Sequence, residues 1–168
     1  MSTAIFSADN VLLSEYAENS QLLKRIWEWD FTRVEKRLLR ERPNLNIQKA
    51  LEQFRYFMYL CLATGPIFVP NQEIDDVAHT AIVFTEDWFR FSLEFNDGYI
   101  HHQPLDEPLQ PNEAAQKLNQ IEELSMSHFG RMVFETGEFV CGMITAAPVC
   151  GMVTTTPVCG MVTSAKTI

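Results

Sequence analysis

The sequence lacks an excess of basic residues, a membrane-length apolar run and a secretion signal. It holds 13 Lys and Arg against 22 Asp and Glu, so its formal net charge is −9. Binding to nucleic acid or to anionic lipid needs a basic face, so this acidity argues against both. Residues 1–6 show no basic start followed by an apolar run, and no stretch reaches the roughly 18 uncharged apolar residues of a membrane span. We expect a cytoplasmic protein whose four cysteines stay reduced.

Catalytic and nucleotide-binding motifs are also missing. The sequence contains no Gly-x-Ser-x-Gly nucleophile elbow, no P-loop and no dinucleotide-binding fingerprint. Its paired acids, such as Glu122 and Glu123, fall on the polar side of a predicted helix and need no catalytic role. We therefore expect a protein that is not an enzyme and that needs no cofactor, with copper or zinc binding as the alternative.

A repeat occupies the end of the chain. The nine-residue unit Val-Cys-Gly-Met-(Ile/Val)-Thr-x-x-Pro runs three times, and Lys166 replaces the proline of the third copy. Lys166 is also the only charged residue after Glu138. The contrast with the charged, aromatic-rich sequence before it predicts two parts: a helical recognition domain over residues 1–138 and a three-unit tail over residues 139–168.

Apolar residues recur every three or four positions before the tail and predict four main helices. These cover residues 12–42, with a break near 19–20, then 47–63, 73–95 as the central helix of a bundle, and 113–130. Asn46 and Asn112 are the predicted N-caps of the second and fourth helices. Residues 66–70 are expected to be extended, and residues 131–138 to close the core or form a short strand. The predicted fold is an all-α, small helical bundle with a flexible or extended repeat tail.

Four residues of the helical domain are candidate metal ligands. Asp75 and His79 are four positions apart and share one face of the third predicted helix, while His101 and His102 follow that helix. Zinc and iron accept imidazole and carboxylate ligands, so a site could combine Asp75, His79 and one of the two later histidines. In the alternative interpretation, Asp75 and His79 form a hydrogen bond at the helix start while His101 and His102 hold a loop.

The same region resembles the glycine-rich domain-containing protein family. Members carry a pattern close to Val-Asp-x-x-Trp-His-x-His-Ile-x-x-Thr, then an aromatic-rich continuation and a glycine ahead of His-His-x-Pro. This sequence has Ala78 and Ala81 where the family often has the tryptophan and the second histidine. The resemblance implies a helical fold rather than a mechanism. The matching residues are Asp75, His79, Thr85, Gly98, His101, His102 and Pro104.

The tail resembles the multi-core precursors of ribosomally synthesised, post-translationally modified peptides, in which a leader is recognised and a repeated core is modified. The thiolate is the better nucleophile of each unit. The implied partners are a modifying enzyme, then a protease and an exporter for the processed tail. The predicted modification sites are Cys141, Cys150 and Cys159, with Thr145, Thr154 and Thr163 as secondary candidates.

Two other functions of the tail stay open. Its three thiolates and three thioethers form a set that suits copper(I), because soft ligands select that ion. The tail could instead be a low-complexity extension, or a strand repeat that pairs with a partner. Outside the tail, Cys61 lies on the apolar stripe of the second predicted helix and is expected to be a small buried side chain.

Overall fold

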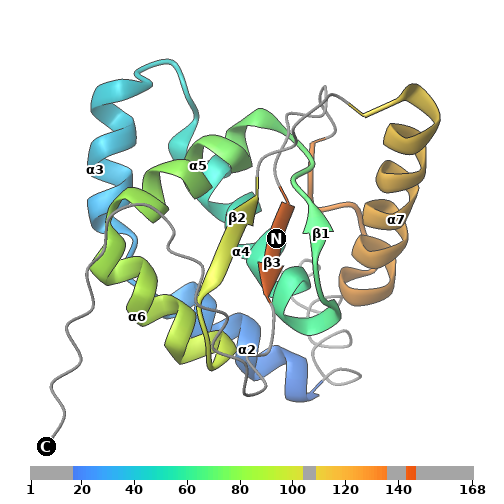
Figure 1. Cartoon of the computed structure of the whole chain (residues 1–168), viewed down its shortest axis with the longest axis horizontal. Coiled ribbons are helices and arrows are strands. Elements are labelled where there is room, and N and C mark those ends of the chain that lie inside the picture. Colours follow the sequence, from blue (N-terminus) through green and yellow to red (C-terminus); the bar gives the residue numbers. More distant parts are fainter. Residues whose placement is uncertain (1–16, 104–108, 136–142, 147–168) are drawn as a thin grey trace, which may run out of the picture.

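The computed structural model describes residues 17–103, 109–135 and 143–146 of the chain (Figure 1). The protein is mostly helical over these ranges, which confirms the predicted all-α class. No helix within them is both long enough and apolar enough to cross a bilayer. The helices are α2 (Ala17–Glu28), α3 (Thr32–Glu41), α4 (Ile47–Thr64), α5 (Gln72–Val83), α6 (Thr85–Asn96) and α7 (Pro111–Phe129).

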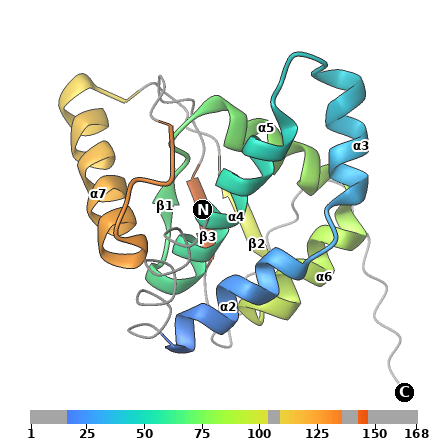
Figure 2. The same cartoon turned by 180° about the vertical axis from the view of Figure 1, so that it is seen from behind.

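Helix α4 lies at the centre of the molecule, in contact with α2, α3, α5 and the sheet (Figure 2). The side chain of Asn46 accepts the backbone N–H of Lys49 and caps its start, as predicted. The helix ends at Gly65, whose φ of +100° suits glycine and few other residues. Its buried side chains, among them Phe54, Phe57 and Met58, make α4 the core helix. The prediction that residues 73–95 form the central helix is therefore wrong.

Residues 73–95 are divided between α5 and α6, which meet at Phe84. The backbone of Phe84 leaves the helical region, with φ −82° and ψ 68°. Its carbonyl then accepts the N–H of Trp88 in the first turn of α6. Glu86 and Asp87 also lie in that turn, where negative charge is favourable. The break changes the chain direction and brings Trp88 onto the core.

The first predicted helix is likewise divided, between α2 and α3, but not at the expected place. Residues 19–20 lie inside α2, and the break falls at residues 29–31. There the carboxylate of Asp30 accepts the backbone N–H of Thr32 at 2.9 Å. Short acidic side chains that bond the backbone in this way favour helix starts over helix interiors. This bond from Asp30, one residue before the N-cap Phe31, therefore interrupts the helix although the apolar periodicity continues.

Helix α7 begins at Pro111, and its N-cap is Gln110, two residues before the predicted cap at Asn112. Pro111 occupies the first turn, where its missing N–H costs nothing. Gln110 and Glu113 form a capping box around it, and Glu113 accepts the Gln110 N–H at 3.1 Å. The helix ends before Gly130, as predicted. Beyond it Phe134 is buried, so residues 131–135 help to close the core.

A small antiparallel sheet is the feature that the sequence did not predict. Its strands are β1 (Ile67–Phe68), β2 (Ile100–Gln103) and β3 (Met143–Ala146), in the order β1-β3-β2. The expected extension of residues 66–70 corresponds to β1. Strand β3 belongs to the first repeat unit of the tail and lies between the other two (Figure 1). Helix α7 contacts β1, and α6 contacts β2.

A buried polar network at Asn71 holds α5 in place. The Asn71 side chain accepts the N–H of Ile74 at 2.9 Å, which caps α5. Its amide donates to Gln53 in α4 at 2.8 Å and to the carbonyl of Glu135 at 2.7 Å. Because Asn71 and Gln53 are both buried, these bonds join three distant segments away from solvent. They place the first turn of α5, and with it Asp75, against the core.

Candidate metal centre

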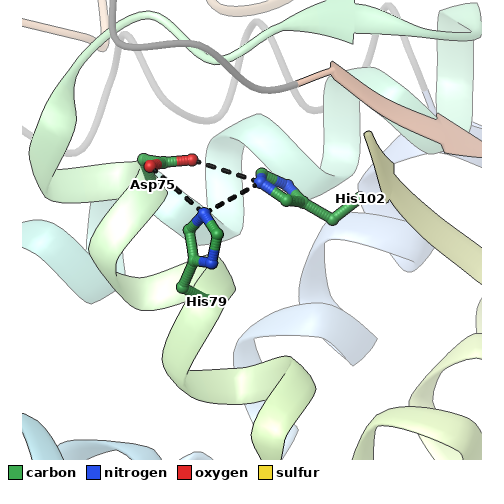
Figure 3. Close-up of side chains that lie close together, drawn as sticks. All are labelled: Asp75, His79 and His102. Carbon is green, nitrogen blue, oxygen red and sulfur yellow. Dashed lines mark hydrogen bonds and ion pairs between the residues drawn. The ribbon is translucent and has the colours of Figure 1, made fainter. Parts of the chain in front are cut away.

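Three side chains converge at one point between α5 and β2 (Figure 3). His79 Nε2 lies 3.4 Å from one carboxylate oxygen of Asp75, and His102 Nε2 lies 3.4 Å from the other. The two histidine Nε2 atoms are 3.1 Å apart. Each residue thus presents a potential ligand atom to the same small volume, and these atoms lie within 4.8 Å of one another.

The separations between these atoms match the edges of a metal coordination polyhedron. Zinc binds imidazole nitrogen and carboxylate oxygen at about 2.0–2.1 Å, so tetrahedral angles put two ligand atoms about 3.3 Å apart. Angles nearer 90° give about 3.0 Å for the same bond lengths. The distance of 3.1 Å between the two Nε2 atoms, and the two N–O distances of 3.4 Å, which run to different oxygens of Asp75, are close to these values. An ion could therefore be held by Asp75, His79 and His102 with little rearrangement.

Helical spacing and strand alternation bring these side chains together. Asp75 and His79 are one turn apart on α5 and therefore lie on one face. Strand β2 is fixed by Trp88, whose indole N–H donates to the carbonyl of Ile100 at 3.0 Å. Side chains two positions apart in a strand share a face. Ile100 is buried, so His102 also points inward.

His101 occupies the opposite face of β2 and does not join the cluster. It is exposed, and its ring meets that of Tyr99 edge-on, with 4.8 Å between the ring centres. Of the four residues predicted as ligands, the structure brings together Asp75, His79 and His102. The sequence analysis required only one of the two later histidines, and the structure selects His102.

Burial changes the acid–base properties of the cluster. The side chains of Asp75 and His102 are 7% and 6% exposed, whereas that of His79 is 58% exposed. Burial raises the pKa of Asp75 to about 6, against the lowering effect of His79. Burial, together with the neighbouring His79, lowers the pKa of His102 to about 4. His102 is therefore neutral at pH 7, the state in which an imidazole can bind a metal.

Two buried polar atoms of the cluster have no hydrogen-bond partner among the described residues. They are the Asp75 oxygen that faces His102 and the Nδ1 atom of His102. Most buried polar atoms in proteins are paired, because an unpaired one costs about 1–3 kcal/mol. A cation between the three side chains would satisfy the carboxylate oxygen. This unpaired oxygen fits a metal site, and the contact between Asp75 and His79 also fits the alternative of a hydrogen bond at the helix start.

An open hollow of about 230 Å³ adjoins the exposed side of His79. Arg37 of α3, Arg42 at the C-cap of α3 and Asp76 of α5 contribute to its wall. Arg42 donates to Asp76 at 2.7 Å, which holds α3 against α5. The sequence analysis missed this hollow because it forms only when two separate helices pack. Of the three cluster residues, His79 lines this hollow, and Asp75 and His102 do not.

The cysteines of the tail cannot be placed relative to this site. Cys141, Cys150 and Cys159, together with Thr154 and Thr163, lie outside the described residues. Thr145 lies in β3 opposite His101, and its side chain is outside the described part. Cys61 is fully buried, and burial raises the pKa of its thiol. It is the small buried side chain that the sequence predicted.

Comparisons with protein-family models, with curated proteins and with solved structures find no match to this chain. The functional assignment therefore depends on the geometry of the cluster and on the sequence of the repeat.

Proposed function

We propose that the helical domain binds a divalent transition-metal ion, zinc or iron(II), through Asp75, His79 and His102. The observation that carries this proposal is the convergence of two imidazole nitrogens and a buried carboxylate at metal-coordination spacing. Two nitrogens and an oxygen suit ions of intermediate softness, whereas calcium and magnesium prefer oxygen alone.

Three protein ligands leave a coordination position free. A structural zinc ion normally has four protein ligands, and an open fourth position is typical of a site that binds water or another molecule. His79 also lines an open hollow that could admit such a molecule. We therefore expect an exchangeable ligand at the metal rather than a closed structural site.

Calorimetric titration of the full chain with zinc, and with iron(II) without oxygen, tests this proposal. The tail thiols also bind zinc, so the titration uses a background in which Cys141, Cys150 and Cys159 are changed to serine. We expect one ion per chain in this background, and at least a tenfold loss of affinity in His102→Ala. His101→Ala is the matched control and retains the affinity. Equal losses in the two alanine variants would contradict the assignment.

A second function is favoured by the repeat itself. We propose that the chain is also a precursor, whose helical domain is recognised by a modifying enzyme while the repeated cysteines are modified. Three near-identical units, each with a thiol beside a glycine, support this proposal. Modification would take place in the cytoplasm, before a protease and an exporter act on the tail. The sites would be Cys141, Cys150 and Cys159, then Thr145, Thr154 and Thr163.

Mass spectrometry separates the precursor role from copper(I) binding by the tail. The chain is produced together with the genes that flank its own, and its peptides are measured. A covalent mass change confined to residues 139–168, and repeated at nine-residue spacing, supports the precursor role. An unaltered mass counts against it. Copper(I) that is bound by the wild type and lost from the triple serine variant would support the metal-binding alternative for the tail.

A further inference from the structure

The sheet contains a slot for one strand. Strands β1 and β2 do not pair with each other, and each pairs antiparallel with β3. Removing β3 would therefore leave two facing rows of unpaired backbone groups, about two strand spacings or 10 Å apart. Unpaired strand edges are ready templates for another extended segment. Because the slot is bordered on both sides, a segment that fills it satisfies backbone groups on both of its edges.

The occupant of this slot is one of three interchangeable sequences. Strand β3 reads Met-Ile-Thr-Ala, and the same positions of the second and third repeat units read Met-Val-Thr-Thr and Met-Val-Thr-Ser. Ile144 pairs with both Ile67 and His102 and is replaced by another β-branched residue, valine, in each later unit. Thr155 takes the place of Ala146 and has the higher strand propensity.

We propose that the three repeat units exchange in this slot, so that residues 143–146, 152–155 and 161–164 each occupy it in turn. Each unit would be held by backbone hydrogen bonds to β1 and β2, and these bonds do not depend on the small side-chain differences between the units. The occupant is a segment of the same chain, because every unit is tethered to Glu135, which the Asn71 network holds in place. This inference depends on neither proposed function.

The lengths of the tethers predict the relative occupancies. The chain between Glu135 and the strand comprises residues 136–142 for the first unit, 136–151 for the second and 136–160 for the third. Loop closure becomes less probable with about the 3/2 power of length, which disfavours the second and third units by about threefold and about sevenfold. The first unit would then occupy the slot for about 70% of the time. The structure accordingly has the first unit in place.

Exchange would leave two units outside the slot at any moment. Each unit would spend part of its time paired in the sheet and part of it accessible to other molecules. A modifying enzyme could then reach all three units without unfolding the domain.

Amide hydrogen exchange of the wild-type chain, resolved by residue, tests the proposal. In a fixed sheet, the amides on the two sides of one strand pair are protected equally. With exchanging units, the β2 amides that face β3 stay covered whichever unit is docked. We therefore expect hydrogen exchange at these β2 amides to be slowed at least tenfold more than at the amides of residues 143–146. Exchange at residues 143–146 should be only about threefold slower than in an unpaired chain. Equal protection of β2 and β3 would overturn the proposal.

A proline substitution provides a second, independent test. Ile144→Pro removes a backbone donor from the first unit and bars it from the slot. In the full chain, β2 protection should fall by only a few fold, because the second unit replaces the first. In a chain that ends at residue 147, the same substitution should abolish the protection of the β2 amides. Far-UV circular dichroism of this shortened chain checks that its helices persist. Equal loss in the two chains would overturn the proposal, as would protection that depends on protein concentration, which indicates a second copy.

Discussion

His102 Nε2 lies 3.1 Å from His79 Nε2, although the two residues are 23 positions apart in the chain. Two imidazole nitrogens at this distance cannot both carry a proton on the facing side. Either one proton is shared between them, or both lone pairs point at one cation. The carboxylate of Asp75, 3.4 Å from each nitrogen, favours positive charge at this point. The metal proposal follows from this relationship.

Asp75→Asn should have opposite effects on metal binding and on folding. The amide removes a charged ligand, so zinc affinity should fall at least tenfold. The buried charge is unfavourable without metal, since burial raises the pKa of Asp75 to about 6. The metal-free variant should therefore be more stable at pH 7, by about 1–3 kcal/mol. Urea unfolding in the presence of a chelator measures this difference. A variant less stable than the wild type would contradict the account.

In the absence of metal, Asp75 and His102 contribute opposite trends to the pH dependence of folding stability. The raised pKa of Asp75 makes its contribution decline as pH rises from about 4 to about 6, because the folded state binds the extra proton. The pKa of His102, lowered to about 4, makes its contribution increase from about pH 4 to about 6.5. The two trends oppose each other in the wild type. In Asp75→Asn the His102 trend is no longer opposed by Asp75, and burial lowers the pKa of His128 in the same direction, so stability should rise with pH across this window.

Metal affinity should itself depend on pH. Asp75 must lose its proton to become a ligand, whereas His102 is already neutral above about pH 4. Because the imidazole of His79 must also be neutral to bind, we expect zinc affinity to be at least tenfold weaker at pH 5 than above pH 7, with at least one proton released per ion at pH 5. Titration in buffers of different ionisation enthalpy measures the released proton. His101→Ala should show the same profile, and an affinity independent of pH between 5 and 7 would contradict the assigned ligand.

Trp88→Phe should weaken the metal site from a distance. Trp88 touches none of the three ligands, but its indole N–H fixes β2 through the carbonyl of Ile100. The substitution leaves that buried carbonyl without its partner, at a cost of about 1–3 kcal/mol in folding stability. It should also lower zinc affinity, since His102 is less well positioned. Ser92→Ala is the control: Ser92 is buried in the same helix, bonds only the carbonyl of Trp88 and should leave zinc affinity unchanged.

Cys61 should be chemically silent in the folded protein. Its side chain is fully buried, and burial raises the pKa of its thiol, so little thiolate forms at neutral pH. In the variant with serine at Cys141, Cys150 and Cys159, no thiol should react with iodoacetamide until denaturant is added. One equivalent should then react. Alkylation of the native variant at the rate of a free thiol would contradict the described packing.

The parts of the fold that local sequence controls were predictable. Asn46, the apolar stripe of α4 and Gly65 all act within a few residues of one another, and the predicted boundaries of α4 are confirmed. The break at Phe84 was not predictable, because the apolar periodicity continues through it. The break depends on how Trp88 packs against α4 and β2, which is a tertiary property.

The sheet and the choice between adjacent histidines had no local signal. Strands of two to four residues are too short for alternation to be visible, and β3 pairs with β2 across about forty residues of chain. The spacing of Asp75 and His79 predicted their shared face. Whether His101 or His102 joins them depends on which alternate side chains of β2 face the core. Ile100 is buried, so His102, two positions later, faces the core as well.

The most direct test of the central claim is X-ray absorption at the zinc edge, on the full-length chain with serine at Cys141, Cys150 and Cys159, loaded with one equivalent of zinc. The account predicts a first shell of nitrogen and oxygen only, at about 2.0–2.1 Å, with the outer-shell scattering of two imidazole rings. That scattering should drop to one ring in His79→Ala and stay at two in His101→Ala. A first shell without imidazole scattering, or imidazole scattering that His79→Ala leaves unchanged, would contradict the account.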